Sequence, residues 1–312
     1  MTNSNLAFVF PGQGSQKIGM LAELAEFNPT VEATFKEASD TLNYDLWQMI
    51  QQGEQEEINL TERTQPMLLA SSVAIWRLWN EKGGPAPAQM AGHSLGEWSA
   101  LVCAGAVEFA DAVKIVRARG AYMQQAVPLG EGAMAAILGL ADDIIVAACD
   151  SARKDGVVDA VNFNAPGQVV IAGTAAAVDR AIAICKEAGA KRAMALPVSA
   201  PFHTSLMQPA AEQLAALVES TAFSSPSIPV VHNVTATSES DAGRIKSLML
   251  EQIYKPVLWV DCVQALKAAG AEYFVECGPG RVLNGLTKRI DRDLKSFSTD
   301  DVASLDNALT SI

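Results

Sequence analysis

The sequence predicts an α/β fold in which a small domain is inserted into a larger one. Short apolar runs typical of buried strands alternate along the chain with longer segments of helical periodicity. Such alternation predicts a parallel sheet that is covered by helices on both faces. Between residues 130 and 198 the order of the elements changes, and 312 residues are enough for two unequal domains.

The large domain begins with an apolar run that ends at the glycine-rich turn PGQGSQ. Further strands are expected within the later segments IPVVHNV and AEYFVECGPG. The other predicted elements are a strand at Leu6–Phe10, helices up to about residue 83 with the longest at Thr61–Trp79, a strand at Ala88–Ala91, helices from Ser94 to about Val127 with a break near Gly105, and a helix at Thr204–Ser220.

The small domain is predicted at residues 129–198, and residues 1–128 and 199–312 form the large domain. Its expected elements are strands at Met134–Leu140, Val157–Phe163, Val169–Gly173 and Arg192–Val198, with helices at Asp142–Arg153 and Ala175–Ala188. This order, βαββαβ, is the ferredoxin-like arrangement. We therefore expect a large α/β-hydrolase-like domain with a parallel sheet and an inserted small ferredoxin-like domain. A site is expected in the cleft between them.

Composition argues against several function classes. The net charge is -12 and no basic cluster stands out, which argues against nucleic acid as a partner. No apolar run approaches the ~18 residues of a membrane span, and no charged leader precedes the first apolar run. The five cysteines form no C-x-x-C pair, and H-E-x-x-H is absent. We expect a cytoplasmic monomer without a bound metal, membrane contact or signal peptide.

A candidate nucleophile lies in the segment AGHSLGEWSA. Gly92 to Gly96 match the pattern G-x-S-x-G between a predicted strand and a predicted helix. Glycines let such a turn bend sharply and keep the hydroxyl of Ser94 clear, and the helix offers free N–H groups to an oxyanion. The alternative interpretation is that Ser94 only caps the helix.

A nucleophilic serine needs a base, and the chain has three histidines. His93 adjoins Ser94 and is expected to point elsewhere, and His232 lies in a predicted strand and is expected to be a core or edge residue. His203 lies where the small domain returns to the large one, at the start of a helix. The helix dipole there disfavours imidazolium, so the ring can accept a proton near neutral pH. His203 is the predicted base.

Two polar residues occupy positions where the helical period predicts apolar ones. Arg119 shares a face with Ile115 and Met123, whereas Arg117 lies on the other face. A buried guanidinium needs an anion, which is either an Asp or Glu of the chain or a substrate carboxylate held by two parallel hydrogen bonds. Gln252 falls on an apolar helix face, where a buried amide is usually structural.

Six segments carry a resemblance to a known family. They are FVFPGQGSQ, GHSLGE, RARGAYMQ, APFHTSLM, LEQIYKPVLW and ECGPGRVL, and they occur in order over nearly the whole chain. Together they resemble the malonyl-CoA:acyl carrier protein transacylases of fatty acid synthesis, which have relatives in polyketide synthases. No such segment is identified after about Phe297.

The resemblance implies roles for the matching residues. Ser94 is similar to the family's nucleophile, His203 to its base and Arg119 to the arginine that holds the malonyl carboxylate. The substrate oxyanion would be held by the backbone N–H groups of Gln13 and Leu95.

Gln252 resembles the residue whose main-chain carbonyl orients the histidine in place of a third carboxylate. Phe202 before the histidine resembles the malonyl-selective form of its motif. The implied reaction is ping-pong transfer of malonyl from malonyl-CoA to the phosphopantetheine thiol of acyl carrier protein, with no bound cofactor.

Three alternatives remain open from the sequence. A serine hydrolase or thioesterase could use the same serine and histidine, but it has no reason to keep Arg119 on an apolar face. A non-catalytic partner in a multienzyme assembly would not need Ser94. Within the family, a free-standing polyketide acyltransferase shares the same motifs.

Overall fold

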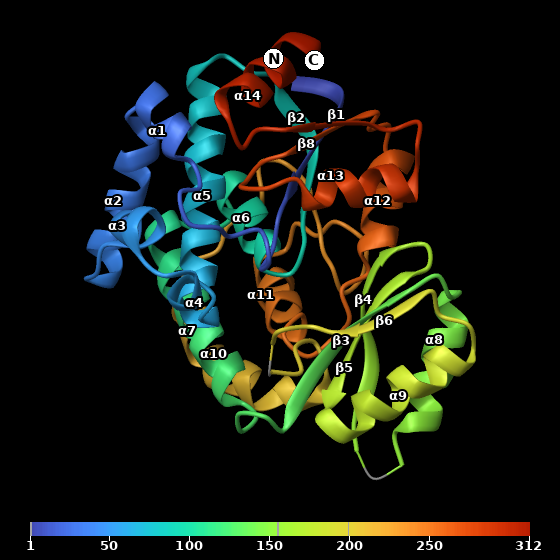
Figure 1. Ribbon diagram of the computed structural model, residues 1–312. Helices are drawn as coiled ribbons and strands as arrows, with labels where there is room; N and C mark the ends of the chain where they lie inside the picture. The colour runs from blue at the N-terminus through green and yellow to red at the C-terminus, as the bar shows by residue number, and fades with distance from the viewer. Residues whose placement is uncertain (1, 155, 199) are drawn as a thin grey trace.

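A five-stranded parallel sheet forms the centre of the molecule (Figure 1). The computed structural model describes residues 2–154, 156–198 and 200–312. The strand order is β7-β2-β1-β8-β9. The strands are β1 (Thr2–Phe10), β2 (Ala86–Gly92), β7 (Val230–Val231), β8 (Tyr273–Glu276) and β9 (Lys295–Ser298).

Helices cover both faces of this sheet. Successive residues of β1 point to opposite faces, and both sets are apolar, so both faces must be buried. Phe8 and Phe10 face the large apolar cluster with α5 and α6, whereas Ala7 and Val9 face the cluster with α12 and α13. The helices are α1 (Ala22–Phe27), α2 (Thr30–Leu42), α3 (Leu46–Gln52), α4 (Gln55–Ile58), α5 (Thr61–Glu81), α6 (Leu95–Cys103), α7 (Phe109–Gln125), α10 (Gln208–Ser220), α11 (Ala242–Glu251), α12 (Trp259–Ala268), α13 (Val282–Ile290) and α14 (Val302–Ser311).

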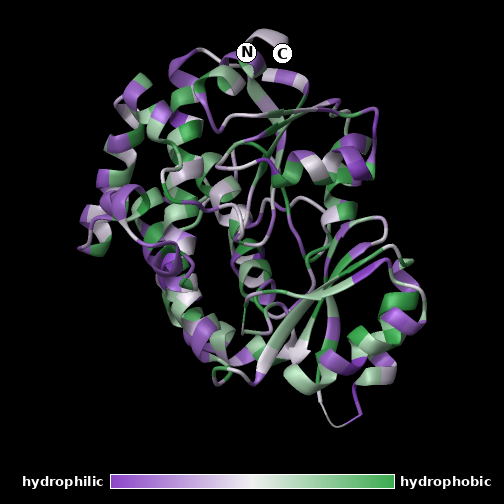
Figure 2. Ribbon diagram, viewed as in Figure 1, coloured by the Kyte–Doolittle hydropathy of each residue, from purple (hydrophilic) through white to green (hydrophobic). Residues whose placement is uncertain are grey.

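A separate four-stranded antiparallel sheet lies beside the parallel one (Figure 1). Its strands in order of pairing are β4 (Val158–Ala165), β5 (Gln168–Thr174), β3 (Gly132–Leu138) and β6 (Arg192–Ala195). The helices α8 (Asp142–Ala152) and α9 (Ala175–Glu187) pack on one face, and their hydrophobic and hydrophilic residues alternate along each helix (Figure 2). The chain order βαββαβ agrees with the ferredoxin-like prediction.

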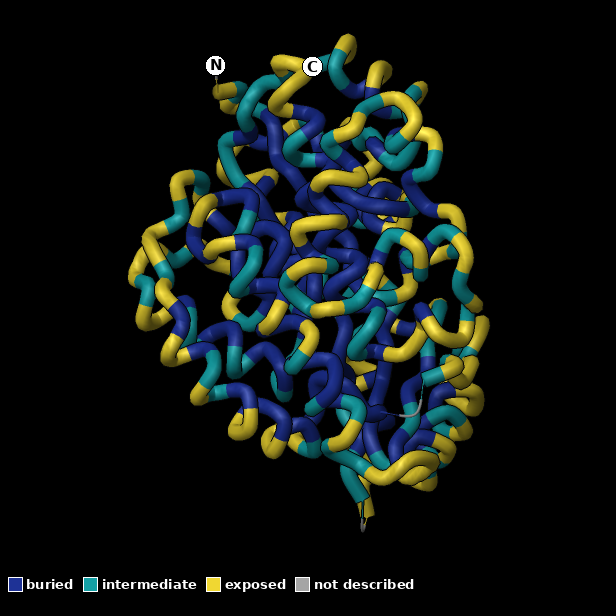
Figure 3. Tube along the Cα trace, turned by 90° about the vertical axis from the view of Figure 1, so that its left-hand side faces the viewer, coloured by how far each residue is buried: buried dark blue, intermediate teal, exposed yellow. Residues whose placement is uncertain are grey.

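The other face of the antiparallel sheet joins the main apolar core. Met134, Val170 and Ala172 belong to the same buried cluster as Phe8 and Phe10 of the parallel sheet. Buried residues therefore run continuously through the molecule, and exposed residues lie at its periphery (Figure 3). This shared core fixes the antiparallel sheet against the edge of the parallel sheet where the site lies.

The strands and helices follow the predicted order, and the main differences are these. Strand β6 ends at Ala195 because Pro197 cannot donate to a sheet. Strand β7 covers only Val230–Val231, so His232 lies after the strand, whereas the prediction placed it inside the strand. Its N–H donates to Thr237 O at 3.0 Å in a turn. The helix predicted from Thr204 begins as a 3-10 turn, η1 (Ser205–Met207). Strand β9 and the helices α12 and α14 were not predicted.

The fold class is therefore α/β, with a parallel sheet and a smaller antiparallel one, as predicted. The residue boundaries of the two predicted domains stay predictions, and residues 1 and 199, at which two of them fall, lie outside the described residues. No described helix is long and apolar enough to span a membrane.

Candidate active site

The carboxyl ends of three neighbouring parallel strands meet at one edge of the sheet. Strand β1 leads into the turn that contains Gln13, β2 leads into Ser94, and β7 leads into Asn233. The carboxyl edge of an open parallel sheet is where such folds form ligand sites. The residues that line the adjoining cavity, whose volume is about 220 Å³, include five of the six predicted site residues: Gln13, Ser94, Leu95, Arg119 and His203.

Ser94 occupies a strained turn between β2 and α6. Its backbone has φ 51° and ψ -107°, a conformation that residues with a side chain rarely adopt. A Cβ on Gly92 would lie 1.9 Å from the backbone carbon of Gly96, and one on Gly96 would lie 2.0 Å from Phe10 O. Both glycines are therefore required for the close approach of the turn to its own helix and to β1. The turn presents the Ser94 hydroxyl to the cavity.

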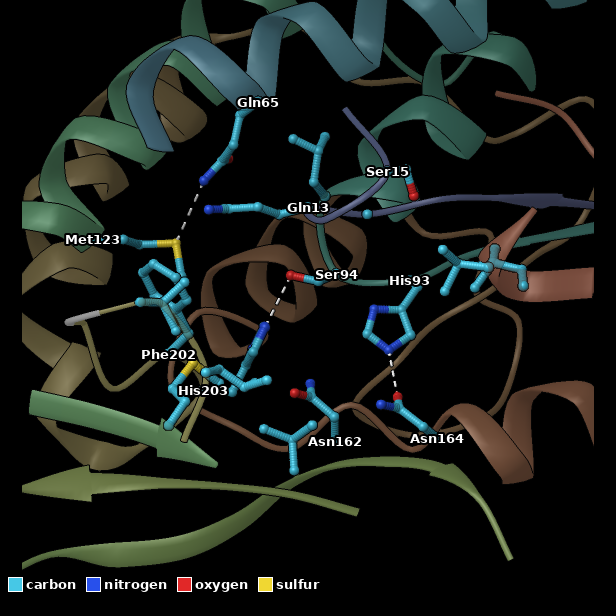
Figure 4. A pocket seen from close by; sticks show the side chains of 18 of the residues that line it. Gln13, Ser15, Gln65, His93, Ser94, Met123, Asn162, Asn164, Phe202 and His203 are labelled. Carbon is cyan, nitrogen blue, oxygen red and sulfur yellow. Dashed lines mark hydrogen bonds between the residues drawn. The ribbon is translucent and has the colours of Figure 1, made fainter. Parts of the chain in front are cut away.

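The hydroxyl of Ser94 lies next to the imidazole of His203 (Figure 4). The Ser94 Oγ to His203 Nε2 distance is 2.9 Å. On the other side of the ring, His203 Nδ1 is 2.7 Å from the main-chain carbonyl oxygen of Gln252. The carbonyl can only accept, so Nδ1 carries the hydrogen and Nε2 is free to accept the hydroxyl proton.

His203 is neutral, but the main cause differs from the predicted one. Burial, together with the nearby Arg119 cation, lowers the pKa of His203 from 6.5 to about 3. The prediction attributed the neutral ring to a helix dipole, yet the regular helix α10 begins only five residues later, at Gln208. Desolvation of the charged ring is the larger influence.

Arg119 is a buried cation at the bottom of the site. Its side chain is 1% exposed, and burial lowers its pKa to about 10, so it remains charged near neutral pH. Nη1 donates to Gln65 Oε1 at 2.8 Å, and Nη2 donates to Gln252 Oε1 at 2.9 Å and to Ser94 Oγ at 3.3 Å. Among the described residues no carboxylate lies within 4.0 Å of Arg119, so it forms no direct ion pair, although the charge of Glu97, which is linked to it through Gln252, raises its pKa.

The two residues predicted to hold the oxyanion through their backbone N–H groups, Gln13 and Leu95, both line the cavity. Leu95 is the first residue of α6, so its N–H precedes the first hydrogen bond within the helix. Gln13 lines the same cavity from the turn after β1, and its side-chain Nε2 donates to Thr61 Oγ1 at 3.3 Å. A pair of donors from two different turns is a common way to stabilise an oxyanion.

A buried polar network behind Ser94 was missed from the sequence. Asn233 Oδ1 accepts from Ser94 N at 2.8 Å, and Asn233 Nδ2 donates to Gly92 O at 2.7 Å. Gln252 Nε2 donates to Ser94 O at 2.9 Å and to Glu97 Oε2 at 2.7 Å. Both backbone groups of the strained serine are therefore held by side-chain amides. Glu97 in the motif GHSLGE was the available signal, because it lies one helical turn after Ser94.

The other two histidines do not contact Ser94. His93 Nε2 is 2.7 Å from Asn164 Oδ1, and the ring points away from the serine (Figure 4). His232 is fully buried, and its Nδ1 is 2.6 Å from Glu97 Oε1. The expectation that both have structural surroundings fits these contacts.

The cavity has two chemically different walls. We call one the bonded wall: Gln65, Ser94, Arg119 and His203 line the cavity there, and Glu97, Asn233 and Gln252 lie behind them in the same continuous hydrogen-bond network. We call the other the sheet wall, because it comes from the antiparallel sheet and the segment after β6: Met134, Asn162, Asn164, Val170, Leu196 and Val198. Helix α13 contributes Val282, Leu283 and Leu286 to the lining. No group of three potential metal ligands occurs within the described part of the chain.

Comparisons with known proteins agree with the motifs. Residues 7–304 match the model of the acyl transferase domain family. The malonyl CoA-acyl carrier protein transacylase of Salmonella typhimurium is 55% identical over 98% of this chain and 99% of its own length. The enzyme of the same name from Bacillus subtilis is 45% identical over 99% of this chain and 98% of its own.

Solved structures are equally similar. An acyl carrier protein S-malonyltransferase from Vibrio cholerae has 55% identity and a TM-score of 0.96, covering 97% of this chain and 99% of its own. A malonyl-transacylase solved in complex with its type II polyketide synthase acyl-carrier protein has 54% identity and a TM-score of 0.98, covering 99% of this chain and 100% of its own.

Proposed function

Because the chain belongs to the malonyl-CoA:acyl carrier protein transacylase family, we propose that it transfers malonyl from malonyl-CoA to the phosphopantetheine thiol of acyl carrier protein. The observation that carries this proposal is Arg119, a buried cation without a carboxylate within 4.0 Å among the described residues, 3.3 Å from the Ser94 hydroxyl. A guanidinium in that position fits an acyl group that ends in an acid.

In the first half-reaction, Ser94 Oγ attacks the thioester carbonyl of malonyl-CoA while His203 Nε2 takes its proton. The oxyanion accepts hydrogen bonds from the N–H groups of Gln13 and Leu95, and Arg119 holds the distal carboxylate. The carbon–sulfur bond breaks, and the departing coenzyme A sulfur receives the proton from His203. A malonyl ester remains on Ser94.

In the second half-reaction, the thiol of the carrier gives its proton to His203 and attacks the ester carbonyl. The carbon–oxygen bond breaks, and Ser94 Oγ recovers the proton from His203. The Gln252 carbonyl keeps hydrogen on Nδ1 throughout, so the ring exchanges protons only at Nε2. The neutral His203 described above is in the protonation state that both attacks require.

We further propose that the carrier is that of fatty acid synthesis and that the enzyme acts as a cytoplasmic monomer without metal or cofactor. It would require no contact with a membrane or a nucleic acid. The names of the relatives support the carrier, and five free, buried cysteines suit a reducing compartment. A type II polyketide carrier is the alternative, because a similar transacylase is seen with one. Transfer rates to the two carrier types test the choice of carrier, and sedimentation of the protein tests the monomeric state.

The central test is the mass of the intact protein after incubation with malonyl-CoA alone. We expect one added malonyl group, located at Ser94 by peptide mapping, and none in Ser94→Ala. Addition of holo acyl carrier protein should then discharge the ester with malonyl appearing on the carrier. Release of free malonate at the same rate with and without carrier would show a thioesterase instead.

A further inference from the structure

Asn162 on β4 is a polar side chain on the sheet wall that the proposed chemistry does not use. It is 7% exposed, and its side chain points into the cavity (Figure 4). Within the described residues its carboxamide has no hydrogen-bond partner, whereas Asn164, two positions along, is bonded to His93 at 2.7 Å. A buried amide that protein groups leave unpaired loses free energy unless water or a ligand pairs with it, and one that lines a cavity is open to a ligand.

A β-bulge aims this side chain at the cavity. The pairing of β4 with β5 shifts between Ala160, opposite Ile171, and Asn162, opposite Val170, so Val161 is an extra residue. Without the bulge, Asn162 would share the face of Ala160, which packs against α8 and α9. With it, Asn162 shares the face of Val170, which lines the cavity. Bulges beside sites commonly re-aim a side chain in this way.

The bulge is anchored to the large-sheet side of the molecule. Val257 N donates to Val161 O at 2.8 Å, and Phe163 N donates to Val257 O at 3.0 Å. The backbone on both sides of Asn162 is therefore held by a single residue of the segment that leads into α12. This attachment fixes where the carboxamide lies relative to Ser94.

We propose that Asn162 binds the first amide of the pantetheine arm that carries the acyl group, an inference that rests on the proposed function. In the proposed reaction the malonyl carboxylate is bound by Arg119 of the bonded wall, and the thioester oxygen by the N–H groups of Gln13 and Leu95. The next polar group of the substrate is a secondary amide, two methylenes beyond the sulfur. It has one donor and one acceptor, and a carboxamide side chain can pair with either of them. The same arm occurs in coenzyme A and in the carrier, so Asn162 serves both half-reactions.

The test compares two malonyl thioesters that differ at this amide. The N-acetylcysteamine thioester carries it, and the pentanethiol thioester has methylenes in its place. For each we measure kcat/KM for malonylation of Ser94 in the wild type, in Asn162→Ala and in the neighbouring Asn164→Ala. We expect Asn162→Ala to lower kcat/KM about tenfold for the amide-bearing thioester, the effect of a lost hydrogen bond in a buried site, and to change it little for the other. The control Asn164→Ala should affect both thioesters by the same factor.

The possible outcomes separate this inference from the proposed function. Equal loss with both thioesters in Asn162→Ala, or no loss with either, overturns the role of Asn162 in binding the amide. A wild-type protein that is not malonylated by either thioester or by malonyl-CoA overturns the proposed function itself. Thermal unfolding of each variant, expected within a few degrees of the wild type, establishes that the rates refer to folded protein.

Discussion

The two walls of the cavity differ in how far their polar groups are satisfied by the protein. On the bonded wall, each amide of Gln252 and Asn233 makes hydrogen bonds through both its oxygen and its nitrogen. On the sheet wall, Asn164 is bonded to His93 and the other neighbours of Asn162 are apolar, so the carboxamide of Asn162 stays open. Fully bonded groups hold a fixed geometry, whereas an open group is available to a ligand. In our proposal the bonded wall therefore carries the covalent chemistry, and the sheet wall recognises the pantetheine arm of the substrate.

Arg119 is the exception that tests this division, because it belongs to the bonded wall and yet has hydrogen-bonding capacity to spare. Its Nε is buried without a partner among the described residues. We expect Arg119→Ala to lower malonyl transfer several hundredfold or more while acetyl transfer is largely kept. Loss of one member of a buried charge pair costs about 3–5 kcal/mol. Rates with malonyl-CoA and acetyl-CoA give the preference.

Arg117 provides the matched control for Arg119. It lies on the opposite face of α7, is half exposed and contacts Glu62 at 3.4 Å. Arg117→Ala should leave the malonyl-over-acetyl preference at the wild-type value. If Arg119→Ala also leaves that preference unchanged, the carboxylate is held elsewhere and the division of the walls is wrong.

Asn233 tests the purely structural side of the bonded wall. In Asn233→Ala, Ser94 N and Gly92 O lose their partners, at a cost of about 1–3 kcal/mol for each buried group left unpaired. We expect a lower free energy of unfolding in urea, and equal reductions of malonyl and acetyl transfer. The exposed Asn307 of α14 supplies a control substitution, Asn307→Ala, with little effect on either. A changed acyl preference in Asn233→Ala would contradict a role limited to holding the turn.

The smallest expected effect concerns pH and His203. Between pH 6.5 and about 3, the unfolded chain binds a proton on this ring that the folded protein excludes. Stability therefore falls as the pH is lowered through this window, by at most about 1.4 kcal/mol per pH unit from this group. Urea unfolding near pH 7 and near pH 5 should show a smaller loss in His203→Asn than in the wild type.

A second buried group, Glu276, changes stability with pH in the opposite direction, and its effect must be separated from that of His203. Burial raises the pKa of Glu276 to about 7, so its contribution to stability grows as the pH falls through that value. It is present in both the wild type and His203→Asn, and it cancels when the two are compared. The same pH dependence in the two proteins would show that His203 is protonated in the folded state.

Much of the fold could be predicted because strands and helices differ in period. The short apolar run Leu6–Phe10 and the βαββαβ order are both local patterns, and both agree with the structure. Strand β7 is only two residues long, because the chain turns immediately to place Asn233 beneath Ser94. A short strand of this kind depends on tertiary contacts that no local period expresses. The bulge at Val161 has the same origin.

The site was predicted unevenly for a similar reason. Ser94, Arg119 and Gln252 each break a local rule, since one lies in a glycine turn and two are polar on apolar helix faces. Gln65 and Asn233 follow no such rule, because a polar residue in a long helix or after a strand is ordinary. Their importance comes from contacts with Arg119 and Ser94 that join positions 54 and 139 residues apart. Asn162 was missed because only the bulge turns it toward the cavity.

The distance along the chain between Ser94 and His203 also has a consequence for how the enzyme acquires activity. The two residues are 109 positions apart, and all four antiparallel strands are synthesised between them. Gln252, against which the imidazole rests, comes later still. A nascent or truncated chain that ends before α11 therefore lacks the group that holds the base, however well its serine turn has formed. Recovery of transferase activity during refolding should accordingly trail the appearance of helical signal, because contacts so remote in sequence are among the last to close.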